Sequence, residues 1–241
     1  MIRFDNLHKA FGGKPVLAGL TLDVRDGETM VIIGYSGSGK SVALKHVVGL
    51  LTPDSGDVIV DGRAVSTLDR AGLTAVRQEI GFVFQFAALL DSLSVAENVA
   101  LGLRRRGLGE EEIAARTGEA LALVDLTGAG ERYPAELSGG MRKRVGIARA
   151  IALRPRYMLY DEPTTGLDPV TAAVIDRLVV RTREHLGSTG VVVTHDMRSA
   201  YTVGDRIAML YEGRIRQVGT VGEVQATTDP VVRQFIEGRP G

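Results

Sequence analysis

The feature that most constrains this chain is the glycine-rich loop Gly34-Tyr-Ser-Gly-Ser-Gly-Lys40-Ser41. A short apolar run, Thr29–Ile33, precedes it and predicts a strand buried on both faces. Apolar residues at helical spacing follow it over 42–51. In a strand–loop–helix unit of this kind, glycine lets the backbone approach a phosphate, and the helix start presents free N–H groups. The loop therefore predicts a phosphate site inside an α/β fold.

The residue types within this loop have separate roles. Lys40 supplies a point charge for the β- and γ-phosphates of a nucleotide, and Ser41 offers a hydroxyl to Mg²⁺. A loop with a purely structural role is the alternative, but chance matches to the full motif are rare, about 0.01 in such a chain. The expected nucleotide-binding residues of the loop are Gly34, Ser36, Gly37, Ser38, Gly39, Lys40, Ser41 and Val42.

The pattern along the chain divides it into three parts. The first third alternates apolar and polar residues, which is typical of half-buried antiparallel strands and tight turns. Residues 95–153 have helical periodicity, and the last third alternates buried strands with helices, as in a parallel sheet. We predict a nucleotide-binding core with an antiparallel β subdomain from 1–90 and 155–220, a helical insertion at 91–154, and a C-terminal tail at 221–241 that packs on its own core or on a partner subunit.

Composition excludes several classes of function. Lys+Arg 29 balances Asp+Glu 29, so a net charge of +0 gives no reason to expect nucleic acid as a partner. The absence of cysteine excludes disulfide scaffolds and thiolate zinc sites. No run approaches about 18 consecutive apolar residues, and the N-terminus has no apolar secretory segment, so we expect neither a membrane span nor export.

A carboxylate pair follows the buried run Tyr157–Tyr160. At the carboxyl end of a central strand, Asp161 can hold Mg²⁺, and Glu162 can orient and deprotonate an attacking water. Two solvated acids in a strand-end turn are the structural alternative. Together with the phosphate loop, the pair predicts ATP hydrolysis.

Leu137-Ser-Gly-Gly-Met141 resembles the signature motif of ABC transporter ATPases, and the other motifs of that family appear around it in order. The resemblance implies a RecA-like P-loop core with ATP and Mg²⁺ as ligands. By this resemblance, Phe11 stacks on adenine, and Gln85 contacts Mg²⁺ or water and couples the γ-phosphate to the helical part. The resemblance also implies that His195 orients Glu162 beside the γ-phosphate. The residues that it places in contact with nucleotide are Ser138, Gly139, Gly140 and Asp168. The structural alternatives are a strand-end core aromatic at Phe11, a loop glutamine at Gln85 and a plain helix cap at Ser138.

The same resemblance implies partners. Each motif occurs once, so the family's arrangement requires a second copy of the chain to complete two ATP sites head to tail. A separate integral membrane permease would dock on the segment Phe86–Val99, whose apolar residues have local core packing as their alternative. The chain is then expected at the cytoplasmic face of the inner membrane, bound through that permease.

Three stretches are similar to the ATPases of Mce/Mla-type lipid transport systems, namely 137–152, Asp161–Pro169 and Asp229–Gly238. This implies phospholipid or other lipid cargo, with Mce-type lipid-binding and small cytoplasmic subunits as further partners. A polar-solute importer ATPase of the glycine-betaine or amino-acid class is the alternative. Met141, Gly166 and Tyr35 depart from the commonest family pattern, although none of them removes a charged or nucleophilic group.

Overall fold

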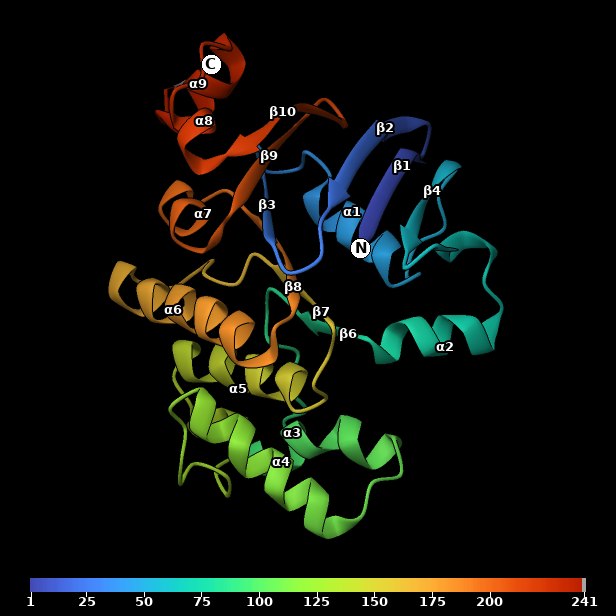
Figure 1. Cartoon of the computed structure of the whole chain (residues 1–241). Helices are drawn as coiled ribbons and strands as arrows, with labels where there is room; N and C mark the ends of the chain where they lie inside the picture. Colours follow the sequence, from blue (N-terminus) through green and yellow to red (C-terminus); the bar gives the residue numbers. More distant parts are fainter. Residues whose placement is uncertain (240–241) are drawn as a thin grey trace.

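The computed structural model describes residues 1–239, and this part of the chain folds around a six-stranded sheet flanked by helices (Figure 1). The sheet is parallel except at its edge strand β10, which pairs antiparallel with β9. Its spatial order is β10 (Arg214–Thr220), β9 (Arg206–Tyr211), β3 (Thr29–Ile33), β8 (Thr189–Thr194), β7 (Tyr157–Asp161) and β6 (Ile80–Val83).

Strand β3 lies in the interior of this sheet and is buried on both faces, as its apolar run predicts. Val31 and Ile33 pack into the cluster that contains the helical segment, whereas Met30 and Ile32 pack into the cluster that contains the N-terminal strands. In a strand, successive side chains point to opposite faces. The phosphate loop therefore starts from a strand fixed by two cores at once.

The N-terminal part forms a second, four-stranded antiparallel sheet, as its alternating pattern predicts. Its order is β2 (Lys14–Val24), β1 (Ile2–Phe11), β4 (Ser55–Val60) and β5 (Arg63–Ala64), followed by the short turn η1 (Val65–Thr67). Helix α1 (Lys40–Val47) packs between the two sheets through its buried residues. Helix α2 (Arg70–Gln78) was not expected in a region interpreted as strands and turns. It begins after Asp69, whose side chain accepts a hydrogen bond from Gly72 N, and it has only one fully buried residue.

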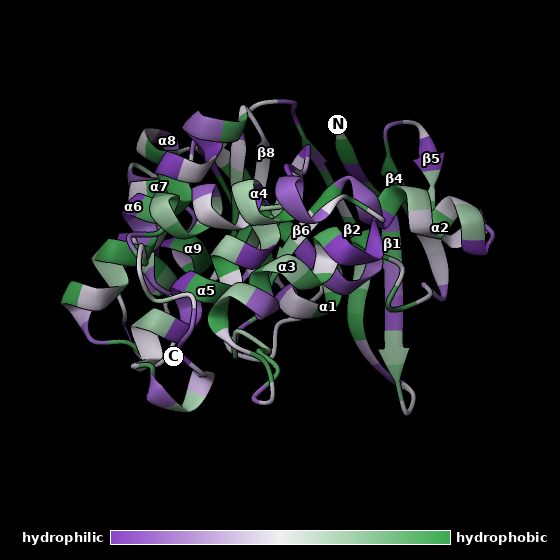
Figure 2. Ribbon diagram, turned by 90° about the horizontal axis from the view of Figure 1, so that it is seen from below, coloured by the Kyte–Doolittle hydropathy of each residue, from purple (hydrophilic) through white to green (hydrophobic). Residues whose placement is uncertain are grey.

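The predicted helical insertion contains α3 (Val95–Arg105), α4 (Glu110–Leu123), the turn η2 (Pro134–Glu136) and α5 (Gly139–Ile151). Figure 1 places α3 and α4 at one end of the molecule, with α5 between them and the sheet. Helix α5 packs on β6 and on α6 (Pro169–Leu186), and its apolar residues share one core cluster with the sheet. The helices carry both hydrophilic and hydrophobic residues along their length, as Figure 2 shows and as one-sided burial requires.

The chain ends with α7 (Met197–Val203), which precedes β9, and with two short helices after β10, namely α8 (Val221–Gln225) and α9 (Pro230–Ile236). The predicted tail thus contains two helices, and Asp229 caps the second, α9, by accepting hydrogen bonds from Val231 N and Val232 N. The tail packs on its own core through Val224 and Val232. Residues 240 and 241 of the predicted tail lie outside the described residues. No helix within 1–239 is long and apolar enough to cross a membrane.

Candidate functional site

A cavity of about 450 Å³ opens where β3 and β7 end, beside the phosphate loop. It brings together residues from five separate segments of the chain. The lining residues are Phe11, Val16, Ser36, Gly37, Gly39, Lys40, Ser41, Val42, Gln85, Glu162, Thr165 and His195. All of these except Val16 and Thr165 were expected from sequence, so the predicted loop, glutamine, glutamate and histidine share one space.

The phosphate loop is built to receive an anion. Helix α1 begins at Gly39 without a capping side chain from any described residue, so its first N–H groups have no side-chain acceptor. The hydroxyl of Ser38 is buried and has no hydrogen-bond partner in the structure. At Gly34, an added Cβ would lie 2.4 Å from Leu210 O, so only glycine fits there. Unpaired donors around a helix start are what a phosphate group requires.

Lys40 is buried, at 6% exposed, and its ammonium lies inside the loop. Its Nζ donates to the carbonyls of Gly34 (2.8 Å) and Tyr35 (3.1 Å), and it lies 3.6 Å from Glu162 Oε1. Burial lowers the pKa of Lys40, while the neighbouring carboxylate of Glu162 opposes that decrease. The loop thus holds a poorly solvated cation at the cavity wall, where a phosphate can bind it.

The residues expected to hold Mg²⁺ offer oxygen ligands. Ser41 Oγ donates to Asp161 Oδ1 at 2.6 Å. Burial raises the pKa of Asp161, and the hydrogen bond from Ser41 opposes this increase. Within 1–239 no three His, Cys, Asp or Glu side chains are arranged to hold a metal by themselves. A hydroxyl and one carboxylate, with substrate phosphates and water, are nevertheless a typical Mg²⁺ environment, and the amide of Gln85 also lines the cavity. The residues present therefore fit this ion.

Glu162 is held in a constrained geometry. Its φ is +48°, a left-handed conformation that is uncommon outside glycine, and its N–H donates to Val193 O at 3.0 Å. Its Oε2 accepts from Thr165 Oγ1 (3.0 Å) and lies 2.9 Å from His195 Nδ1. Because an ionised carboxylate can only accept, His195 must carry its proton on Nδ1 in this contact. The glutamate is thus fixed from two sides and faces the cavity.

Six of the expected nucleotide-binding residues do not line this cavity: Gly34 and Ser38, which lie within the phosphate loop beside it, and Ser138, Gly139, Gly140 and Asp168, which lie elsewhere. Ser138 caps α5 by accepting from Met141 N at 3.2 Å, and Asp168 caps α6. The two segments are neighbours, since a Cβ at Gly140 would lie 2.5 Å from Thr171 Cγ2. Ser138, Gly139 and Asp168 are exposed. A single chain therefore does not bring this second helix start to its own phosphate loop.

Sequence reasoning did not identify two cations on α5. Lys143 is buried, and its Nζ donates to Gln85 O (2.5 Å) and Glu162 O (3.3 Å). Arg149 donates to the carbonyls of Ala87 and Ala88, both at 2.6 Å, and these two alanines have positive φ. Burial lowers the pKa of both cations. Thr165 was missed as well, since its hydroxyl gives no distinctive signal in a threonine-containing turn. Side chains that bind main-chain carbonyls leave no spacing pattern in a sequence.

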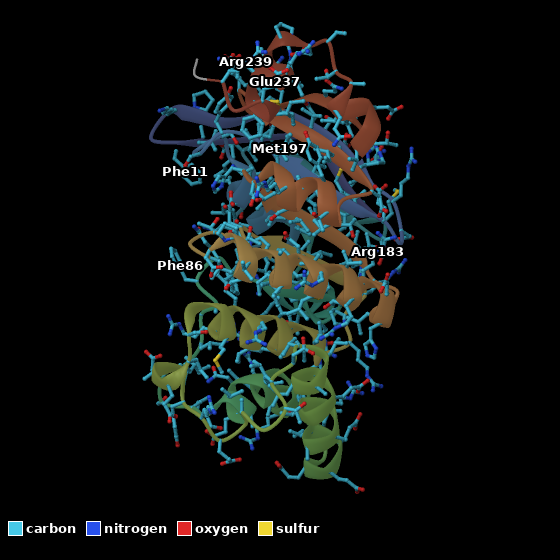
Figure 3. All side chains as sticks on the ribbon, turned by 90° about the vertical axis from the view of Figure 1, so that its left-hand side faces the viewer. Phe11, Phe86, Arg183, Met197, Glu237 and Arg239 are labelled. Carbon is cyan, nitrogen blue, oxygen red and sulfur yellow. The ribbon has the colours of Figure 1, made fainter. Side chains whose placement is uncertain are left out.

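Two exposed aromatic residues project from the same side of the molecule (Figure 3). Phe11 ends β1 at the cavity, is 47% exposed, and has the ammonium of Lys9 5.6 Å from its ring centre. Phe86 follows Gln85 and is 85% exposed. Of the predicted docking segment, Val95 and Val99 are buried in the core, while Phe86 and Leu90 face solvent. The apolar residues of this segment therefore divide between core packing and exposure to solvent.

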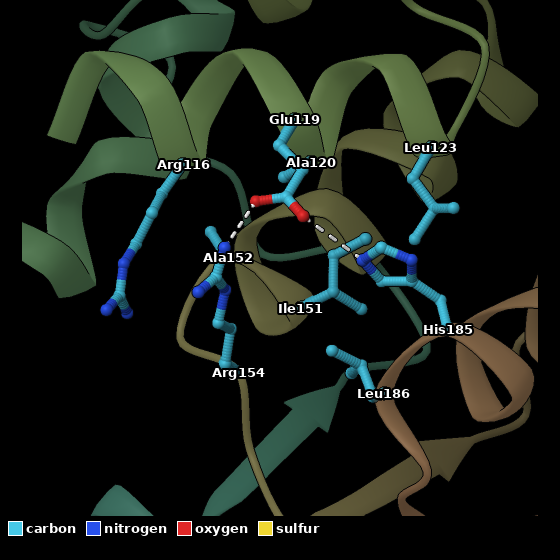
Figure 4. A pocket seen from close by; sticks show the side chains of 9 residues that line it. All are labelled: Arg116, Glu119, Ala120, Leu123, Ile151, Ala152, Arg154, His185 and Leu186. Atoms are coloured by element: carbon cyan, nitrogen blue, oxygen red, sulfur yellow. Dashed lines mark hydrogen bonds and ion pairs between the residues drawn. The ribbon is translucent and has the colours of Figure 1, made fainter. Parts of the chain in front are cut away.

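A separate pocket of about 10 Å³ lies between α4, the end of α5 and the end of α6 (Figure 4). Glu119 from α4 bridges Arg154 (2.7 Å) and His185 (3.2 Å) across it. The arginine and the histidine lower the pKa of this glutamate by hydrogen bonding and charge. The pocket has room for about one water molecule at most, so we interpret these residues as a connection between the helical segment and α6.

Comparison with known proteins agrees with this geometry. The family described as ABC transporter matches residues 17–165. The methionine import ATP-binding protein MetN of Caulobacter vibrioides is 45% identical over 100% of this chain and 74% of its own length. The chloroplastic protein trigalactosyldiacylglycerol 3 of Arabidopsis thaliana is 40% identical over 99% of this chain and 74% of its own length.

Among solved structures, a dimeric ATP-binding cassette in a post-hydrolysis state bound to ADP and Pi has a TM-score of 0.83 and 36% identity. The alignment covers 92% of this chain and 99% of that one. The predicted fold class, a RecA-like P-loop core with an antiparallel β subdomain and an inserted helical subdomain, is confirmed by this likeness.

Proposed function

The chain belongs to the ABC transporter family, and from this premise we propose that two copies together hydrolyse ATP to drive lipid transport through a separate permease. Family membership makes the chain an ATP hydrolase that binds ATP with Mg²⁺. The composite site, the permease and the lipid cargo are the proposed parts. One observation carries the enzymatic role: Lys40, Glu162 and His195 converge on one cavity although they come from distant segments.

The chemistry proposed for this cavity uses positioned charges. Lys40 Nζ, already oriented by two carbonyls, binds the β- and γ-phosphate oxygens. Glu162, fixed by Thr165 and His195, accepts the proton of the attacking water. Mg²⁺ supplies charge neutralisation on the phosphate oxygens when it is bound, and Ser41 and Asp161 are the residues that would hold it, with Gln85 beside them.

We assign the second half of each site to a partner copy. The helix start at Ser138 and Gly139 is exposed and lies outside its own chain's cavity, and a helix start of this kind binds anions. Asp168 begins the neighbouring α6 and is exposed too. A head-to-tail pair would bring these groups to the γ-phosphate side of the other chain's nucleotide. The helical part at 91–154 is, in this proposal, the unit that presents them.

The permease is proposed to dock on the exposed patch at Phe86 and Leu90. A phenylalanine 85% exposed on a loop is an unusual surface feature, and large exposed apolar groups are typical of interaction sites. The loop also contains Gln85, whose side chain lines the cavity. Docking there would attach the chain peripherally to the cytoplasmic face of the inner membrane.

Lipid is the proposed cargo. Support comes from the Mce/Mla-like stretches 137–152, Asp161–Pro169 and Asp229–Gly238, and from the Arabidopsis relative named for a galactolipid. Mce-type lipid-binding subunits and small cytoplasmic subunits would complete such a system. A polar-solute importer is the second candidate, and the methionine-import relative at 45% identity favours it. The cavity is proposed to bind nucleotide and not cargo, so its residues do not discriminate between the two cargoes.

The test is purification of the chain with its membrane partners, followed by ATPase measurements in vesicles. Lipid transport predicts a permease that copurifies with a lipid-binding subunit, together with hydrolysis that responds to phospholipid composition. Copurification with a soluble solute-binding protein, and stimulation by methionine or another small polar solute, would replace the lipid proposal with the second candidate. A preparation of either kind that hydrolyses no ATP would contradict the proposed role altogether.

A further inference from the structure

Tyr35 is an unusual residue within the phosphate loop, and its ring points away from the nucleotide cavity. It is not among the residues that line the cavity. Instead, the ring packs edge-on against Phe235 of α9, with 5.0 Å between ring centres and an interplanar angle of 81°. Tyr211, at the end of β9, completes the cluster at 6.4 Å and 62°. The ring of Tyr35 therefore lies between the sheet edge and the C-terminal tail.

The backbone of the same residue belongs to the phosphate site. The carbonyl of Tyr35 accepts hydrogen bonds from Lys40 Nζ and from Ser38 N, both at 3.1 Å. The ring and this carbonyl are attached to adjacent backbone atoms, so packing of the ring helps to fix the peptide whose carbonyl orients Lys40. The contact made outside the cavity thus bears on a group inside it.

The tail holds its own position without the ring of Tyr35. Val232 is fully buried, Asp229 caps α9 and pairs with Arg216 at 2.8 Å, and Thr227 Oγ1 donates to Gln217 Oε1 at 2.5 Å. These contacts connect α9 to strand β10. The position of Phe235 beside the phosphate loop is therefore fixed by contacts that do not involve Tyr35.

We propose that Phe235 of α9 and Tyr35 are positioning residues that hold the phosphate loop in its binding conformation. The inference rests on the proposed function only in taking ATP as the ligand. It gives Phe235 a role that the motifs of the chain do not assign. Edge-to-face aromatic pairs stabilise by an amount that corresponds to a roughly two- to tenfold change in an equilibrium constant.

The experiment is a double-mutant cycle on ATP affinity in the full chain, with the free energy of unfolding measured in parallel. Phe235→Leu and Tyr35→Leu remove one ring each but keep an apolar side chain. We expect each to weaken ATP binding by roughly two- to tenfold, and the double variant to bind no more weakly than the worse single variant. Tyr35→Phe keeps the ring and should restore affinity close to that of the wild type.

Arg233→Ala is the matched control, because Arg233 lies on the same helix, is exposed, and pairs only with Glu237 among the described residues. It should leave ATP affinity unchanged. Independent, additive losses from Phe235→Leu and Tyr35→Leu would overturn the proposal, as would a change in stability with unaltered ATP affinity. A wild-type chain that binds no ATP would instead refute the proposed function itself.

Discussion

A buried acid outside the cavity gives the sharpest quantitative prediction. Asp176 lies on α6 and is 6% exposed. Its Oδ2 accepts from Ser199 Oγ at 3.0 Å, and the same hydroxyl lies 3.3 Å from Thr164 Oγ1 and 3.4 Å from Asp196 Oδ2. This small network joins α6, the turn after Glu162 and the loop after His195. We therefore expect the charge of Asp176 to affect the stability of the region that holds Glu162 and His195.

Burial raises the pKa of Asp176 from its ordinary 3.8 to about 6. The hydrogen bond from Ser199 and the charge of Arg177 oppose the increase, and the charge of Asp196 adds to it. Each tenfold change in proton affinity corresponds to about 1.4 kcal/mol, so ionising this group in the native state costs about 3 kcal/mol relative to the unfolded chain. Between these two pKa values the native state holds more protons, so stability falls as pH rises and the loss is complete above about pH 6.

Asp176→Asn keeps an acceptor for Ser199 and removes the titration. We expect its free energy of unfolding, relative to the wild type, to rise by about 2 kcal/mol between about pH 4.5 and pH 8. Urea unfolding at several pH values measures this difference, because other titrating groups cancel between the two proteins. Asp91→Asn, at an exposed aspartate outside this network, is the control for removing a carboxylate. A flat difference for Asp176→Asn would refute the reasoning.

Three further predictions concern the catalytic cycle. Glu162→Gln should retain ATP binding, stop turnover and accumulate a closed dimer in light scattering; turnover at the wild-type rate would remove Glu162 as the base. Ser138→Arg and Lys40→Ala should each abolish hydrolysis when both subunits carry the same substitution. Mixed dimers of the two variants should recover at most one of the two sites. Normal hydrolysis by each variant alone would contradict a shared site. Lys143→Met should lower kcat by about tenfold with ATP affinity unchanged, since positioning of Glu162 is lost, and Lys143→Arg should recover part of the lost kcat. Equal kinetics for Lys143→Met and the wild type would show that the two carbonyl contacts of Lys143 do not affect turnover.

Local patterns in the sequence were sufficient to predict the phosphate site. The loop from Gly34 to Ser41 and the strand before it follow spacing rules that depend on neighbouring residues alone. The carboxylates at Asp161 and Glu162 follow the same logic, because parallel strands end at one edge of a sheet. The roles of Phe11, Gln85 and His195 were inferred from family resemblance, and that inference depends on the order of motifs along the whole chain. Their place at one cavity agrees with those assignments, and their roles in binding and hydrolysis stay predictions.

Contacts between distant segments could not be predicted in the same way. Helix α2 is a different case, since it is amphipathic and begins after the capping residue Asp69, so its own sequence carries helical signals that the interpretation as strands and turns missed. The ring contact between Tyr35 and Phe235 joins residues 200 positions apart, through two side chains that have no charge or motif in common. Lys143 is similar, since a lysine on a helix is normally solvated and nothing nearby in sequence indicates its burial.

These distant contacts suggest how force passes between the permease and the nucleotide. Phe86 is exposed on a loop whose carbonyls are held by α5, through Lys143 at Gln85 and through Arg149 at Ala87 and Ala88. The first turn of α5 carries the exposed anion site proposed to serve the partner's ATP. A partner that displaces Phe86 must therefore either break three hydrogen bonds that charged groups donate to the loop or move α5 with the loop. Hydrogen bonds to charged groups are worth about 1.5–3 kcal/mol each, so these three contacts favour joint movement of the loop and α5. The proposed docking site and the proposed contact with the partner's nucleotide are thereby connected through one helix.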